Sequence, residues 1–100
     1  MKARIFAALA DPTRRQILQE LKEGELAAGD IVSRFHLSGP AISRHLSILS
    51  AAGLISARRE TNRIYYRVEP EPLADTLGEF LSAVCPTQIL HRSRKKRRAK

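Results

Sequence analysis

Apolar residues recur at intervals of three or four through the first fifty positions of this chain, which is the spacing of one face of an α-helix. A short first helix is followed by a second that starts at Asp11-Pro12, because aspartate is a favoured N-cap and proline is tolerated at the first helical position. The second helix is expected to end near Gly24, and a third is expected over residues 28–35. Their apolar positions are Ile5, Phe6 and Leu9; Ile17, Leu18 and Leu21; and Ile31, Val32 and Phe35.

Residues 38–53 predict a fourth helix whose two sides differ in character. Ser38 is placed to cap it, Pro40 lies in its first turn, and Gly53 follows its end. Its apolar side carries Ile42, Leu46 and Leu49. The other side contains no acidic residue and is small and polar apart from Arg44. Because only a short link separates it from the third helix, the pair predicts a helix-turn-helix.

The period of the apolar positions then changes from helical to alternating between residues 54 and 68. β-branched and aromatic residues flank a polar turn at Thr61-Asn62, which is typical of a β-hairpin. Helical spacing returns over residues 73–84, with an apolar face wider than a small domain needs for its own core. That face consists of Leu73, Leu77, Phe80, Leu81 and Val84.

Charge is distributed unevenly along the chain, whose formal net charge is +8. Residues 91–100 contain seven bases and no acid, whereas residues 69–90 contain four acids and no base. Residues 34–68 carry six arginines against Glu60 alone, so this part of the fold is suited to an anion. We expect a folded domain over residues 1–88 and a disordered basic tail over residues 89–100.

The composition excludes several classes of protein. No apolar run approaches the roughly 18 residues that a membrane span requires, and the N-terminal apolar run is too short for a secretory signal. Cys85 is the only cysteine, so no intrachain disulfide can form. No catalytic Cys/His or Ser/His/Asp set is evident. We expect a cytoplasmic protein without a membrane span or enzymatic activity, associated with the nucleoid when bound to DNA.

The order helix, helix, helix-turn-helix, hairpin, helix is that of a winged-helix domain, a mainly α (α+β) fold of about five helices. In such domains the second helix of the turn motif enters the major groove, and the hairpin reaches the flanking backbone. An acid-free face of small residues permits close approach, and arginine can bind a guanine edge bidentately or a phosphate. The residues expected to contact double-stranded DNA are Ser38, Gly39, Pro40, Ser43, Arg44, His45, Arg58, Arg59, Asn62 and Arg63.

Two observations restrict the list of residues expected to contact DNA. His45 lies at the flank of the apolar stripe, which favours a packing role over base reading. Arg58, Arg59, Arg63 and Arg67 alternate along the hairpin, so some of them must face away from any ligand. Arg63, next to the turn, is the strongest candidate for a phosphate or minor-groove contact.

Three stretches resemble the small ArsR/SmtB-type winged-helix repressors of bacteria. They are FAALADPTRRQIL, GELAAGDIVSRFHLSGPAISRHLSILSAAGLISARR and RIYYRV, in the order and spacing of that family, and they cover residues 1 to about 85. The resemblance implies a homodimer that binds an inverted-repeat operator and represses transcription through it. It implies an interface of the first and last helices, which carry Ile5, Phe6, Leu9, Leu73, Leu77, Phe80, Leu81 and Val84.

The resemblance also indicates where metal-sensing members hold their ion. Those members carry Cys-x-Cys within ELCxCDL, whereas this chain reads ELAAGDI, with Ala27 and Gly29 in place of the thiolates. A second set of Asp and His ligands lies on their last helix, which here has Asp75 and Glu79 but no histidine. Because zinc and soft metals need several converging N or S ligands, we expect no metal or other cofactor. The inducing signal would then be a protein partner or a small molecule.

Two other functions are compatible with the same residues. A winged helix can act as a protein-interaction module whose cationic face binds an acidic partner. A sensor can hold a relocated metal or redox site, for instance a cross-dimer disulfide through Cys85. Competition by ordinary duplex DNA tests the first alternative, and metal titration or non-reducing electrophoresis tests the second.

Deleting residues 91–100 is expected to weaken binding to all DNA alike, because a free polycation adds affinity with little sequence preference. The salt dependence of binding should flatten as well. Titration of specific and unrelated duplexes at two salt concentrations measures both effects. A truncated protein that keeps the full salt slope would show that the tail takes no part in binding.

Overall fold

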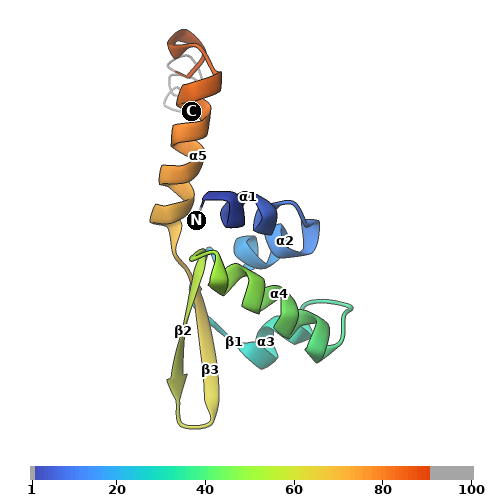
Figure 1. Ribbon diagram of the computed structural model, residues 1–100. Helices are drawn as coiled ribbons and strands as arrows, with labels where there is room; N and C mark the ends of the chain where they lie inside the picture. Colours follow the sequence, from blue (N-terminus) through green and yellow to red (C-terminus); the bar gives the residue numbers. More distant parts are fainter. Residues whose placement is uncertain (1, 91–100) are drawn as a thin grey trace.

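A computed structural model of the chain describes residues 2–90. In chain order its elements are α1 (Lys2–Leu9), α2 (Pro12–Glu20), β1 (Leu26–Ala27), α3 (Ala28–Ser33), α4 (Gly39–Ala51), β2 (Ile55–Glu60), β3 (Arg63–Val68) and α5 (Pro70–Val84) (Figure 1). The mainly helical fold with a helix-turn-helix and a hairpin is therefore confirmed. The hairpin formed by β2 and β3 is called the wing below. Residues 91–100, most of the predicted disordered tail, lie outside the described residues.

The predicted helix starts follow from local capping. The Asp11 carboxylate accepts hydrogen bonds from the backbone N–H groups of Thr13, at 2.8 Å, and Arg14, at 3.2 Å, and so caps α2. The Ser38 hydroxyl accepts one from the backbone N–H of Ala41, at 3.2 Å, and caps α4. Gly53 follows the C-cap of α4 with φ at +77°, the left-handed conformation in which glycine carries no steric penalty.

Several boundaries differ from the sequence-based expectation. α2 ends at Glu20 rather than near Gly24, and α3 ends at Ser33 rather than at Phe35. Both ends give way to tight turns whose backbone hydrogen bonds span three residues, such as Gly24 N–H to the carbonyl of Leu21, at 3.2 Å. α1 is the short first helix that was expected, with 8 residues from Lys2 to Leu9.

The sheet contains one strand that the sequence pattern did not predict. β1 pairs antiparallel with β3, Leu26 opposite Tyr66 and Ala27 opposite Tyr65, so the strand order is β1-β3-β2. Within the wing, β2 and β3 pair from Ile55 opposite Val68 to Glu60 opposite Arg63, around the predicted two-residue turn. The short strand ties the segment before α3 to the base of the wing.

The core lies between α1, α2, α3, α4 and the base of the wing. All three apolar residues that α4 was expected to bury are buried, and Leu54 and Ile55 close the core beneath the wing. Ile5, which was expected at a dimer interface, is only 5% exposed and belongs to this core. Its side chain therefore leaves little surface for a partner.

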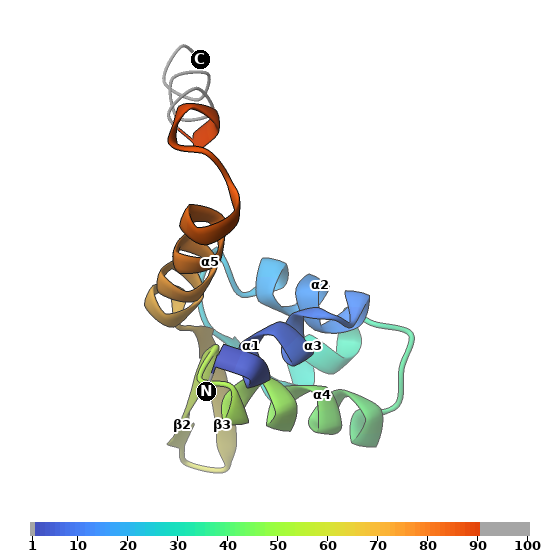
Figure 2. The same ribbon diagram turned by 45° about the horizontal axis from the view of Figure 1, so that its top comes forward.

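α5 extends beyond the body of the domain instead of packing along it (Figures 1 and 2). Its first turns are anchored by half-buried Leu73 and buried Thr76, and the Phe80 ring meets that of Phe6 on α1 edge-on, with centroids 5.5 Å apart. Phe80, Leu81 and Val84 remain exposed. Among the helices of residues 2–90, none has the length and apolar character needed to cross a membrane.

Gly53→Ala should destabilise the protein by roughly 1 kcal/mol, because an L-residue at φ +77° is strained even though open space surrounds the position. Gly29→Ala is the matched control. Its Cβ also meets open space, but the residue is helical, so alanine should stabilise by up to about 1 kcal/mol. Urea unfolding at a fixed protein concentration measures both. Equal effects of the same sign would contradict this account of the turn.

Candidate nucleic-acid interface

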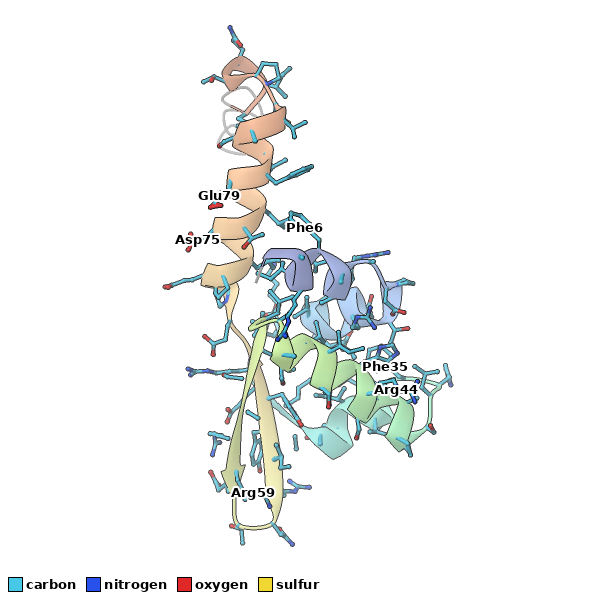
Figure 3. The ribbon with its side chains drawn as sticks, in the orientation of Figure 1. Phe6, Phe35, Arg44, Arg59, Asp75 and Glu79 are labelled. Carbon is cyan, nitrogen blue, oxygen red and sulfur yellow. The ribbon has the colours of Figure 1, made fainter. Side chains whose placement is uncertain are left out.

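The solvent face of α4 is the surface that the sequence singled out for DNA. Pro40, Ser43, Arg44 and Ser47 are all exposed, and the helix contains no acid. Arg44 projects from the outer side of α4 (Figure 3). Within residues 2–90 its guanidinium has no ion-pair partner. The face therefore combines small side chains, which leave the backbone accessible, with one uncompensated cation.

The six arginines of residues 34–68 fall into two groups, which their sequence positions do not reveal. Three are paired with carboxylates. Arg34 meets Glu20 at 2.8 Å, and Arg67 Nε lies 3.1 Å from a carboxylate oxygen of Glu69. Arg58 is held by both Glu25 and Glu60. The remaining three are Arg44, Arg59 and Arg63, which form no salt bridge in the described part of the chain.

The register of the wing places Arg59 on one face of the hairpin and Arg58, Arg63 and Arg67 on the other. Residues opposite one another share a face, so Arg59 and Ile64 lie on the side that continues to Tyr66 and the core. Arg58 lies on the other side, with its guanidinium 4.7 Å from the centre of the Tyr65 ring. Arg58 was expected to contact DNA, but it is engaged by two carboxylates and an aromatic ring on the outer face of the wing.

Arg59, Asn62 and Arg63 are exposed at or near the free end of the wing. Figure 3 shows Arg59 there, in the half of the molecule that carries Arg44 and lies away from the far end of α5. A hydrogen bond with Tyr65, and then the charges of Tyr65 and Asp30, raise the pKa of Arg63 further above its ordinary value. The free end of the wing is therefore cationic.

The paired carboxylates on the outer face of the wing are stabilised in their charged form. A hydrogen bond from Arg58 lowers the pKa of Glu25, and hydrogen bonds from Ser56 and Arg67 lower that of Glu69. The same contact with Glu25, followed by that with Glu60, raises the pKa of Arg58. These groups neutralise one another, which leaves α4 and the free end of the wing as the cationic part of this region.

Two predicted DNA contacts also have structural roles. Ser38 caps α4, as described above. His45 is half-buried, and its Nδ1 lies 3.2 Å from Nη1 of Arg14 on α2. Arg14 was not among the residues that the sequence singled out for a function. The contact joins positions 31 apart in the chain, and no local pattern signals it.

The two positions that correspond to the Cys-x-Cys ligands of metal-sensing members, Ala27 and Gly29, lack ligating side chains. Ala27 is buried in β1 and Gly29 lies at the start of α3. Asp75 and Glu79 project from the side of α5 that faces away from Phe6 (Figure 3). Across residues 2–90, no three His, Cys, Asp or Glu side chains are grouped closely enough to hold a metal ion.

Comparison with known proteins identifies relatives of the chain. The family model described as bacterial regulatory protein, arsR family, matches residues 11–57. The chain is 44% identical over 80 residues to the transcriptional repressor SdpR of Bacillus subtilis (strain 168), which covers 80% of this chain and 89% of that protein. It is 42% identical over 73 residues to a probable mercury resistance operon repressor of Streptomyces lividans, covering 73% of this chain and 58% of that one.

Solved structures give the same result for the fold. The structure of an ArsR-like transcriptional regulator from Rhodococcus sp. RHA1 matches with a TM-score of 0.78 at 32% identity, over 97% of this chain and 88% of that chain. The structure of NolR from Sinorhizobium fredii matches with a TM-score of 0.67 at 35% identity, over 82% of each. The part matched by the family model runs from the cap of α2 into β2 and includes the whole helix-turn-helix.

Proposed function

Because the chain belongs to the arsR family of bacterial regulatory proteins, we propose that it is a dimeric transcriptional repressor that binds an operator through α4 and the wing. The observation that carries this proposal is the solvent face of α4, which is free of acid and carries the unpaired Arg44. Its site of action would be the DNA in the cytoplasm.

Each part of this surface suits a different contact. The major groove is about 12 Å wide and admits an α-helix, and the small side chains of Pro40 and Ser43 let α4 lie close to the base edges. Arg44 would bind a guanine edge through two hydrogen bonds or, failing that, a phosphate. Arg59 and Arg63 at the free end of the wing would bind the flanking backbone.

A second copy of the chain would cover the apolar surface that the domain leaves exposed. Phe6, Phe80, Leu81 and Val84 are each at least 40% exposed on α1 and α5, and α5 stands away from the body. Ile5 contributes to the core, and Leu9 and Leu73 are partly buried against it, so these three would be secondary. Two-fold pairing would present two α4 helices to an inverted repeat.

Repression would not depend on a metal held at the positions of the family's thiolates. Ala27 and Gly29 offer no ligating side chain, and the signal that relieves repression would be a protein or a small molecule.

Arg44→Ala should lower affinity for the operator by about 1 to 3 kcal/mol, the discrimination typical of one bidentate contact with a base, while the dimer stays intact. Arg58→Ala is the matched control, because it removes the same charge from an arginine engaged by Glu25 and Glu60. Fluorescence anisotropy with the DNA upstream of the chain's own gene measures both. Equal losses would mean that only net charge matters, which would remove Arg44 from the reading surface.

Val84→Glu should raise the dissociation constant of the dimer at least about tenfold, because the interface would bury an unpaired carboxylate. Val84 is 62% exposed in the protomer, so the substitution should leave the fold intact. Ser82→Glu adds the same charge at a neighbouring exposed position, one helical turn from Glu79, and should leave the dimer unchanged. Sedimentation equilibrium that finds both variants dimeric would place the interface elsewhere.

A further inference from the structure

Arg14 connects three helices through a single side chain. Its Nε donates to the carbonyl of Ala8, at 2.8 Å, and its Nη2 donates to that of Ala7, at 3.1 Å, both at the end of α1. Its Nη1 lies 3.2 Å from Nδ1 of His45 on α4. Arg14 itself belongs to the first turn of α2, where its backbone N–H donates to the Asp11 cap.

This arrangement satisfies groups that a helix end leaves without partners. The last four carbonyls of an α-helix have no intrahelical donor, and α1 is only 8 residues long. Arg14 donates to two of these carbonyls, of which Ala7 also accepts from the backbone N–H of Ala10, at 3.2 Å, and Arg15 donates to a third, that of Leu9, at 2.7 Å. Because the guanidinium is a rigid planar fork, its two bonds to α1 fix the direction of the third nitrogen, which meets His45.

As a hydrogen bond, the contact requires one tautomer of the His45 ring. A guanidinium can only donate, so Nδ1 must be the acceptor and the ring N–H must be at Nε2. His45 stands between exposed Arg44 and buried Leu46 in the chain of α4. The apolar stripe turns one side of α4 toward the core, and the directional hydrogen bond to His45 adds a narrower constraint on the rotation of the helix.

We propose that Arg14 is a positioning residue for operator recognition, which sets the rotation of α4, and hence the direction of Arg44, through its hydrogen bond to His45. The inference rests on the proposed function of α4. α1 also carries Phe6, which belongs to the proposed dimer contact. Because Arg14 joins α1 to α4, it would also set the orientation of the two α4 helices of a dimer relative to each other. Arg14 would therefore influence which spacing between the two operator half-sites the dimer can bind.

The test compares variants at both ends of the hydrogen bond. His45→Leu removes the acceptor but keeps an apolar side chain of similar size. Arg14→Lys keeps the charge but cannot bond two carbonyls and a histidine at once. Each should weaken operator binding about tenfold, the effect of losing one partly buried hydrogen bond to a charged group, and leave binding to unrelated duplex unchanged. His45→Asn, whose side-chain oxygen can replace Nδ1 as acceptor, should restore operator binding.

Combining Arg14→Lys with His45→Leu should add little to either single loss, because both remove the same interaction. Wild-type operator affinity in His45→Leu, or equal losses on operator and unrelated duplex, would overturn the inference. If Arg14→Lys fails to fold, His45→Leu decides alone, since it leaves the bonds to α1 in place. If the wild-type protein itself does not distinguish the two duplexes, the proposed function fails instead of this inference.

Discussion

Burial of the apolar stripe of α4 is the constraint on which the candidate interface depends. Ile42 and Leu49 are fully buried and Leu46 nearly so. Each such side chain contributes about 1.5 to 3 kcal/mol when it leaves water, so the three together outweigh any single polar contact of the helix. With that side of the helix turned inward, Ser43 and Arg44 must face solvent. The chemistry of the exposed face is therefore a consequence of the core.

Salt bridges determine which arginines near this surface remain unpaired. Ion pairs as exposed as those of Arg34, Arg58 and Arg67 contribute little to stability, but they neutralise three of the six arginines of residues 34–68. Among the six arginines of residues 34–68, the three that form no salt bridge in the described chain, Arg44, Arg59 and Arg63, lie on α4 and the wing. A ligand with regularly spaced negative charge would meet both elements at once, which is the property that double-stranded DNA offers.

Sequence predicted best those features whose causes are local. Ser38 and Gly53 bound α4 as expected, because an N-cap and a left-handed residue act through the adjacent turn. β1 escaped prediction because two residues show no alternation, and they become a strand only by pairing with Tyr65 and Tyr66 far along the chain. The contact of Arg58 with Glu25 spans 33 residues and that of Arg14 with His45 spans 31, so neither leaves a local pattern.

The central claim is that α4 and the wing read DNA without a metal. The most direct test is a titration of the purified protein on its own upstream DNA and on an unrelated duplex, at two salt concentrations, with EDTA and with added zinc. A metal-independent repressor should bind tightly, favour the upstream DNA at both salt concentrations and be unaffected by EDTA and zinc. Weak binding that does not distinguish the duplexes, or specific binding that appears or disappears with zinc, would contradict it.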